Sequence, residues 1–90
     1  MDFYEIQWKR SAISDLHKID RQFIKRIIKA IENLATNPFP QQSKKLLGTE
    51  HIYRLRISAY RVIYEVNADT KIITIYYVRH RKDIYRGKLY

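Results

Sequence analysis

The chain contains no cysteine and only two glycines and two prolines among its 90 residues. Without cysteine, neither a disulfide nor a cysteine-ligated zinc site can hold the fold together. So little glycine also excludes a glycine-rich loop that cradles a phosphate. No stretch approaches the roughly 20 apolar residues of a membrane span, and the first residues lack a signal-peptide pattern. We therefore expect a cytoplasmic protein with no membrane partner and no cofactor, folded as a single domain over residues 1–90.

Acidic residues are scarce as well. Nine Asp and Glu face eighteen Lys and Arg, which gives a net charge of +9. Residues 1–43 carry seven basic and five acidic side chains, whereas residues 44–90 carry eleven and four. This asymmetry favours a surface for a polyanion such as nucleic acid, an anionic membrane or an acidic protein; the alternative is a solvated basic face. Glu65 stands alone, and no acidic pair suggests a metal-dependent nuclease, so we expect no metal site.

The first half of the chain predicts one strand and two helices. Residues 3–8 (FYEIQW) alternate between two faces, as in a half-buried strand. Apolar residues recur at helical spacing in residues 11–19, where Ser11 can cap the start. They recur again over about fifteen residues from Arg21, with Asp20 as the capping residue. The two helices are close in sequence, so we expect them to form an antiparallel pair.

The second half predicts three strands. Pro38 and Pro40 cannot continue a helix, and the pattern then changes to period two. Residues 52–57 (IYRLRI) and 60–66 (YRVIYEV) alternate between two faces. Residues 71–78 (KIITIYYV) are nearly all apolar, which suggests a central strand covered on both faces.

These elements predict an α+β fold in the order β-α-α-β-β-β. An N-terminal strand is followed by an antiparallel helical hairpin and a three-stranded antiparallel meander, and the strands form one small, mostly antiparallel sheet. One helical layer covers one face of the sheet. We expect the other face to have no covering layer and to carry Arg54, Arg56 and Arg61.

The arginines form the first candidate site. Arg54 and Arg56 are two residues apart, so they project from the same side of one strand, roughly 6–7 Å apart. Arg61 follows a tight turn and is expected beside them. Such a cluster repels itself unless an anion binds there, and guanidinium grips phosphate oxygens through two hydrogen bonds. The alternative is a strand face that carries arginine for solubility. Further basic residues follow the last predicted strand: Arg79, Arg81 and Lys82.

Phosphate chemistry at such a site would run without a metal, which RNA permits because its 2′-hydroxyl is an internal nucleophile beside the scissile phosphate. The protein need only align that hydroxyl, take its proton, stabilise the added charge and protonate the leaving oxygen. Tyrosine among arginines, or histidine near neutral pH, can transfer the proton. Tyr85 and His80 are the candidates, and we expect the end of the last strand to bring them, with Arg81, to the arginine face.

The segments KKLLG, IYRLRI, YRVIYEV and HRKDIYR resemble the RelE/ParE superfamily of bacterial and archaeal toxins, whose element order is also β-α-α-β-β-β. The last segment resembles the RelE branch. This resemblance implies the toxin of a type II toxin-antitoxin system, acting as an mRNA interferase. Such an endoribonuclease enters the ribosomal A site, cuts mRNA through the 2′-hydroxyl without metal, and inhibits translation. It also implies a small cognate antitoxin that would bring acidic and apolar residues to the basic face.

The resemblance also implies roles for particular residues. Tyr85 would be the general base or would orient the 2′-hydroxyl. Arg61 would stabilise the charged phosphorane, and Arg81 would stabilise or protonate the leaving oxygen, with His80 as an alternative acid. RNA-backbone binding would fall to four further basic residues, of which the first two stand where some relatives have lysines: Arg54, Arg56, Lys44 and Lys45.

Two other functions stay open. A ParE-like inhibitor of DNA gyrase would bind a protein target and cut nothing, and those relatives usually lack the basic C-terminal segment with its tyrosine. A non-catalytic RNA-binding module would bind RNA in a salt-sensitive manner, and its binding would survive Tyr85→Phe.

Overall fold

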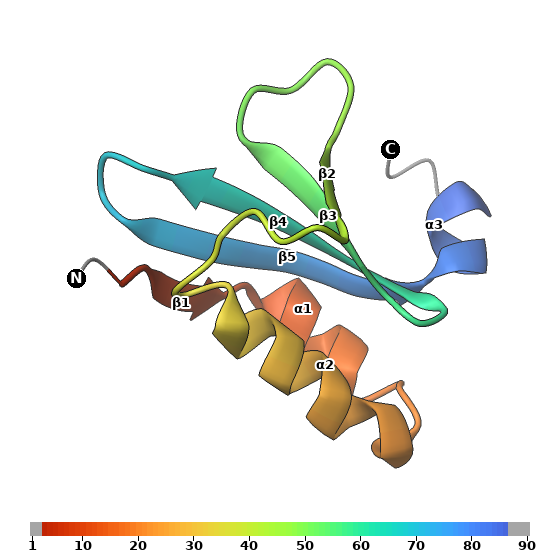
Figure 1. Ribbon diagram of the computed structural model, residues 1–90. Coiled ribbons are helices and arrows are strands. Elements are labelled where there is room, and N and C mark those ends of the chain that lie inside the picture. The colour runs from red at the N-terminus through yellow and green to blue at the C-terminus, as the bar shows by residue number, and fades with distance from the viewer. Residues whose placement is uncertain (1–2, 87–90) are drawn as a thin grey trace.

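The computed structural model describes residues 3–86, and the side chains of residues 3–83. The strands form one sheet in the order β1-β5-β4-β3-β2. Helices α1 and α2 lie together on one side of the sheet, and α3 lies beyond the end of β5 (Figure 1). Within these residues no helix is long and apolar enough to cross a membrane. The elements are β1 (Glu5–Trp8), α1 (Arg10–Leu16), α2 (Arg21–Asn33), β2 (Ser43–Lys45), β3 (Ile52–Ile57), β4 (Tyr60–Asn67), β5 (Ile72–His80) and α3 (Arg81–Arg86).

The predicted α+β class and meander are confirmed. Strands β3, β4 and β5 pair in antiparallel order, as the three alternating segments indicated. The N-terminal strand returns beside the last one, and β1 pairs with β5 in parallel, from Glu5 opposite Ile72 to Trp8 opposite Ile75. The sheet is therefore mixed, and β5 is an internal strand between β1 and β4.

Two elements were not predicted. Ser43–Lys45 forms the short edge strand β2, which pairs with β3 from Ser43 opposite Leu55 to Lys45 opposite Tyr53. The terminal segment forms helix α3, which begins directly after β5. In addition, β5 extends to His80, so Arg79 and His80 belong to the strand and do not follow it.

Helix α2 forms as its sequence suggests. Asp20 caps it, with its Oδ1 accepting a hydrogen bond from the backbone N–H of Gln22 at 3.4 Å. Its apolar stripe buries Ile27 and Ile31 against the sheet. The capping role predicted for Ser11 at the start of α1 is wrong, because α1 has no side-chain cap and Lys9 is its N-cap residue.

Helix α1 instead completes the edge of β5 beyond the end of β1. The Ser11 hydroxyl donates a hydrogen bond to the carbonyl of Tyr76 at 2.6 Å. Farther along, Asp15 Oδ2 accepts a hydrogen bond from the backbone N–H of Val78 at 3.0 Å. Side chains of a helix therefore satisfy backbone groups that a neighbouring strand would otherwise satisfy.

The main core lies between α1, α2 and one face of the sheet, and includes Leu55, Val62 and Tyr64. As predicted, no helical layer covers the opposite face, but a small apolar cluster lies on it. Ile63 projects there with 1% of its surface exposed and packs in a small cluster with Leu46, Ile52 and Tyr77. The arginines of this face therefore surround an apolar patch.

A β-bulge alters the alternation of β5. Ile63 lies opposite Tyr77, but the next residue, Tyr64, lies opposite Ile75, so Tyr76 is an extra residue in β5. An extra residue reverses the faces of all later side chains in a strand. As a result, Arg79 shares the face of Ile63, whereas His80 projects to the helix-covered side.

Candidate functional site

Three arginines lie opposite one another across three neighbouring strands. Arg56 of β3 pairs with Arg61 of β4, and Arg61 pairs with Arg79 of β5. Arg54 lies on the same face, two residues before Arg56, with Lys44 of β2 opposite it. The prediction that Arg54, Arg56 and Arg61 share one face is thus confirmed. Like charges directly opposite each other destabilise a sheet, so this row requires compensation.

The turn between β3 and β4 orients two of the basic groups. Ser58 takes the left-handed backbone conformation there, with φ 55°. The Arg61 guanidinium folds back over the turn and donates to the carbonyls of Ser58 and Tyr60, both at 3.0 Å. On the other side, the backbone N–H of Arg81 donates to the carbonyl of Ala59 at 2.7 Å. The turn therefore holds Arg61 and the start of α3 together.

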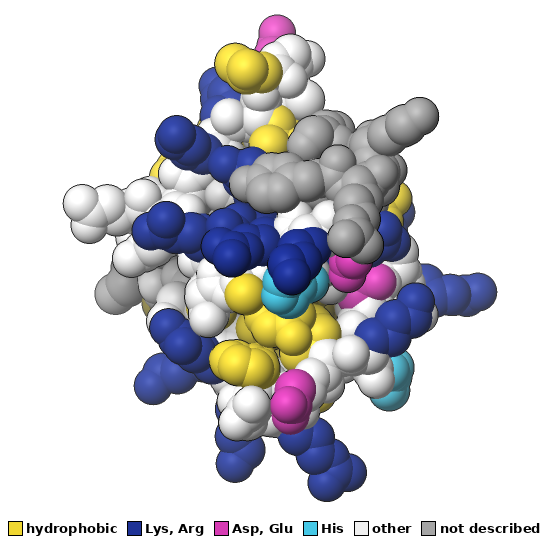
Figure 2. Space-filling model, turned by 90° about the vertical axis from the view of Figure 1, so that its right-hand side faces the viewer, with side chains coloured by type: hydrophobic (Ala, Val, Ile, Leu, Met, Phe, Trp, Pro, Cys, Tyr) yellow, Lys and Arg dark blue, Asp and Glu magenta, His cyan; other side chains and the backbone are white. Residues whose placement is uncertain are grey.

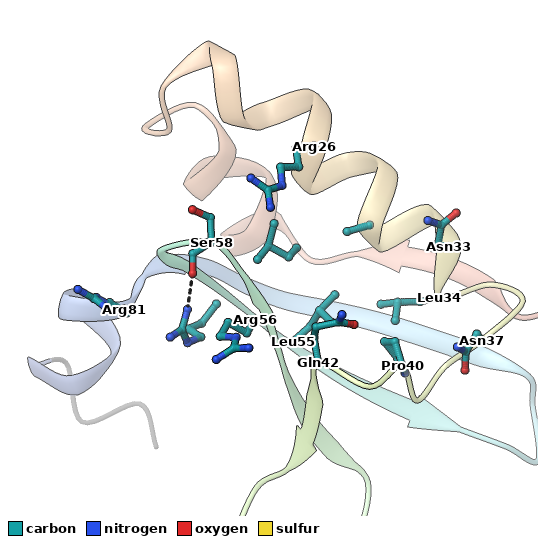
Figure 3. Close-up of a pocket in the computed structure, with 13 residues that line it drawn as sticks. Arg26, Asn33, Leu34, Asn37, Pro40, Gln42, Leu55, Arg56, Ser58 and Arg81 are labelled. Carbon is teal, nitrogen blue, oxygen red and sulfur yellow. Dashed lines mark hydrogen bonds between the residues drawn. The ribbon is translucent and has the colours of Figure 1, made fainter.

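A cavity of about 620 Å³ opens beside this turn, between α2 and the sheet edge beyond the start of β2. Its described lining includes no acidic residue. Figure 3 shows Arg26 of α2 and Arg56 of β3 at one end of it, with Arg81 of α3 beyond the turn. Figure 2, which looks at the molecule from the α3 side, shows many Lys and Arg side chains on this side and a group of hydrophobic side chains beside a histidine. The arginines that line the cavity are Arg26, Arg56, Arg61 and Arg81.

Arg26 is the member of this group that sequence reasoning missed. It belongs to the polar side of α2, which the helical pattern assigns to solvent. In the structure, Arg26, Ala30 and Asn33 all line the cavity. They are four and three residues apart, the spacing of neighbours on one helix face. These three residues form a stripe next to the apolar stripe of α2. This pattern could have indicated the cavity from the sequence, since the small side chain of Ala30 leaves space between Arg26 and Asn33.

Arg79 is compensated by a buried carboxylate. Its Nε lies 3.3 Å from Asp15 Oδ2, and its guanidinium lies 4.7 Å from the centre of the Tyr77 ring. Arg79 is therefore an ion-paired member of the row and has less capacity for an external anion than its neighbours. Sequence analysis assigned no role to Asp15, although it is the acidic partner of Arg79.

His80 does not join the arginines, contrary to the prediction. Its ring packs edge-on to that of Tyr60, opposite it on β4, with 5.5 Å between ring centres. His80 Nδ1 accepts a hydrogen bond from the backbone N–H of Lys82 at 3.2 Å. It lines a second cavity of about 360 Å³ together with Asp15 and Asp83. The side chain of Tyr85, the other predicted proton-transfer residue, lies outside the described residues.

The two lysines of β2 diverge. Lys44 lies opposite Arg54 and extends the arginine face toward the sheet edge. Lys45 projects to the other side, where its Nζ lies 6.0 Å from the centre of the Tyr53 ring. The structure therefore associates Lys44, and not Lys45, with the predicted RNA-binding surface.

Tyr64 has a structural role in this fold. Its side chain is fully buried, and its hydroxyl donates to the carbonyl of Pro38 at 2.8 Å. Burial raises the pKa of Tyr64 to about 12, because the phenolate is poorly solvated there. Such a group keeps its proton and takes no part in acid–base chemistry.

Among the described residues, no group of His, Asp and Glu side chains is arranged to hold a metal ion.

Comparison with known proteins identifies the family. Residues 6–85 match the ParE toxin family of type II toxin-antitoxin systems, parDE. A putative toxin RelE1 of Methanocaldococcus jannaschii is 31% identical over 87 residues, which cover 93% of this chain and 97% of that protein. A chain of the archaeal RelE-RelB complex from Pyrococcus horikoshii is 28% identical with a TM-score of 0.78, over 88% of this chain and 96% of that one.

A RelB-RelE antitoxin-toxin complex from Methanococcus jannaschii gives a similar result. Its matched chain is 31% identical with a TM-score of 0.75, and the match covers 90% of this chain and 96% of that one. The family match spans most of the sequence, and the solved relatives share the mixed α+β architecture along nearly their whole length. This chain therefore belongs to the RelE/ParE superfamily of type II toxin-antitoxin toxins.

Proposed function

We propose that this protein is a ribosome-dependent mRNA interferase, an endoribonuclease that inhibits translation by cutting mRNA through the RNA 2′-hydroxyl without a metal. The observation that carries the proposal is the arginine cluster around the β3–β4 turn. Arg56, Arg61 and Arg81 come from three different elements and line one cavity whose described lining has no acidic residue. A site of this kind favours a ligand that gains negative charge, as the phosphorane does in the transition state.

In this mechanism, Arg61 stabilises the phosphorane. Its hydrogen bonds to two turn carbonyls fix the guanidinium before RNA binds, and a preorganised donor costs little reorganisation during the reaction. Arg81 stabilises the leaving oxygen, because guanidinium keeps its proton at physiological pH. Arg56 holds the scissile phosphate, while Arg54 and Lys44, outside the cavity, hold the RNA backbone farther along the sheet.

Tyr85 supplies the base or orients the 2′-hydroxyl. Its position follows Arg81 by four residues in α3, the spacing at which two positions share one helix face. His80 is the alternative acid, although its ring projects to the opposite face of β5 and its Nδ1 already accepts a hydrogen bond.

A cognate antitoxin is the proposed protein partner. The relatives from Pyrococcus horikoshii and Methanococcus jannaschii were solved as RelE-RelB and RelB-RelE complexes. The excess of basic residues on this chain suits a silencing partner with acidic residues. Action on translating ribosomes would take place in the cytoplasm.

The proposal is tested in a translation reaction programmed with one defined mRNA, read by primer extension for new 5′ ends. Wild type, Arg61→Ala and Tyr85→Phe are compared, each with and without ribosomes. Arg21→Ala is the matched control, because Arg21 is an exposed arginine of α2 that does not line the cavity. We expect ribosome-dependent cuts that fade in both test variants and persist in the control. Intact mRNA with wild type, where a known interferase cuts, would refute the proposal.

The second candidate is a ParE-like gyrase inhibitor, which the match to the ParE toxin family favours. It predicts inhibition of gyrase supercoiling by wild type and no new mRNA 5′ ends. A non-catalytic RNA-binding module predicts neither effect, but predicts salt-sensitive RNA binding that Tyr85→Phe leaves unchanged.

A further inference from the structure

The cavity between α2 and the sheet has two chemically different ends. The end nearest the β3–β4 turn holds the arginines. Toward the other end, Figure 3 shows Gln42 between Arg56 and Leu34, and Asn37 beyond Pro40. Both amide residues line the cavity. The site therefore passes from cationic to neutral polar along its length.

The amides at the neutral end are available for a ligand. The main chain there is occupied: the Gln42 carbonyl accepts from Arg56 N–H at 3.2 Å, and Asn37 N–H donates to the Asn33 carbonyl at 3.1 Å. The side-chain amides of Gln42 and Asn37, in contrast, form no hydrogen bond within the described part of the chain. Each amide offers both a donor and an acceptor at a position fixed by its backbone.

The lining between the two ends is partly apolar. Ala30 and Pro40 line the cavity and are partly exposed, whereas Leu34 and Leu55, with 0% and 3% of their surfaces exposed, belong to the core behind the lining. Apolar lining with a few polar groups is the usual composition of small-ligand pockets, which typically enclose about 300–1,000 Å³. The volume of about 620 Å³ falls within that range.

We propose that this cavity binds one unpaired nucleotide of the RNA next to the scissile phosphate. This inference rests on the proposed function, from which it takes RNA as the substrate and the position of the scissile phosphate. Arg26 binds the phosphate of that nucleotide from the α2 side, opposite Arg56. The base lies against Pro40, and the side-chain amide of Gln42 hydrogen-bonds to its edge, with Asn37 as the second residue that contacts the base.

The chemistry of this layout implies base preference as well as binding. Arginine contacts to phosphate carry no sequence information, whereas amide contacts to base edges do. Asn and Gln side chains can form paired hydrogen bonds with a base edge, as they do with adenine. Arg26 therefore contributes affinity for any nucleotide, and Gln42 contributes discrimination between nucleotides.

The direct test is a titration of ¹⁵N-labelled protein with single-stranded 2′-O-methyl tetranucleotides of each base, which cannot be cleaved through the 2′-hydroxyl. The side-chain amide signals of Gln42 and Asn37 report on the cavity, and those of Gln7 and Gln22, which are bonded to Glu5 and Asp20 respectively, serve as references. We expect the cavity signals to shift with an affinity that depends on the base, and the reference signals to stay in place.

Matched variants separate the two roles. Arg26→Ala is expected to weaken binding of every tetranucleotide by about tenfold, the loss of one charge-assisted contact. Arg21→Ala removes the same charge from the same helix but not from the cavity, and is expected to change binding by less than about twofold through general screening. Gln42→Ala is expected to narrow the differences among the four bases while binding persists.

The outcomes distinguish this inference from the proposed function. Silent cavity amides, or equal effects of Arg26→Ala and Arg21→Ala, would overturn the nucleotide site even if mRNA is cut. Base-dependent shifts without mRNA cleavage would support the nucleotide site and count against the interferase. Shifts produced by an acidic peptide such as hexaglutamate, but not by the tetranucleotides, would assign the cavity to a protein partner and overturn the inference.

Discussion

Replacing Asp15 should reveal how much the fold depends on one carboxylate. Asp15 is buried, with 6% of its surface exposed, and its Oδ2 accepts from both Val78 N–H at 3.0 Å and Arg79 Nε at 3.3 Å. Asp15→Ala removes this acceptor and with it both hydrogen bonds. The Val78 N–H then has no partner at the edge of β5, and Arg79 faces Arg61 without its counter-charge.

The magnitude follows from the exposure of each partner. A buried N–H without a partner costs about 1–3 kcal/mol. The side chain of Arg79 is 34% exposed, so water can solvate it, and loss of the ion pair adds at most about 1 kcal/mol. We expect Asp15→Ala to lower the free energy of unfolding by about 1–4 kcal/mol. Asp15→Asn keeps an amide oxygen for Val78 and loses only the charge, so about 1 kcal/mol is expected.

The assay is urea unfolding at pH 7, followed by circular dichroism and by the fluorescence of Trp8, the single tryptophan. Arg79→Met, alone and combined with each Asp15 variant, gives the coupling energy of the pair by a double-mutant cycle. The expected order is a large loss for alanine and a small one for asparagine. Equal losses for the two Asp15 variants would refute the argument that the hydrogen bond to Val78, more than the charge, stabilises this edge.

Further perturbations test other parts of the structure. Arg61→Ala should lower the rate of mRNA cleavage by roughly 100-fold, as expected for loss of one transition-state donor; an undiminished rate would remove Arg61 from the mechanism. Tyr64→Phe should lower stability at pH 8 by about 1 kcal/mol, because the hydroxyl loses its bond to Pro38. With a pKa raised from 10.0 to about 12, wild-type Tyr64 contributes fully below pH 10 and loses that contribution as pH rises through 12. The Phe variant should therefore lose less stability than wild type over that range, and parallel unfolding profiles would contradict this. Ile27→Ala should cost about 2–5 kcal/mol in urea unfolding, because Ile27 is fully buried. Asp15→Asn should steepen the salt dependence of single-stranded RNA binding by up to about 0.7 in log–log slope, because it releases one guanidinium.

Much of the fold could be predicted from the sequence because most of its helices and strands have one solvent-exposed face and one buried face. Helix α2 and strand β3 show this most clearly, since their apolar residues recur at the spacing of the element that forms. Strand β2 could not be predicted, because Ser43–Lys45 is too short for an alternating pattern and forms only against the edge of β3. Helix α3 could not be predicted either, because its six residues are mostly charged or polar and show no apolar stripe.

The candidate site was predicted in part. Spacing alone was sufficient to put Arg54, Arg56 and Arg61 on one face, since all three lie in regular strands. Spacing alone could not predict which face of β5 carries His80, because the bulge at Tyr76 reverses the alternation of side chains before His80. A bulge depends on how two strands pair and leaves little trace in either strand by itself. The contribution of Arg26 likewise depends on where α2 docks, which its helical pattern does not specify.

The contacts of the three arginines in the row also suggest at which end of the row an anion should bind. At the β5 end, Arg79 is neutralised by a buried carboxylate. In the middle, Arg61 donates to two turn carbonyls, which orient its guanidinium. At the β3 end, Arg56 is exposed and has no ion pair with any described residue. Arg79 at one end is thus ion-paired and Arg56 at the other is not, so we expect an anion to bind more readily at the Arg56 end, where the cavity opens.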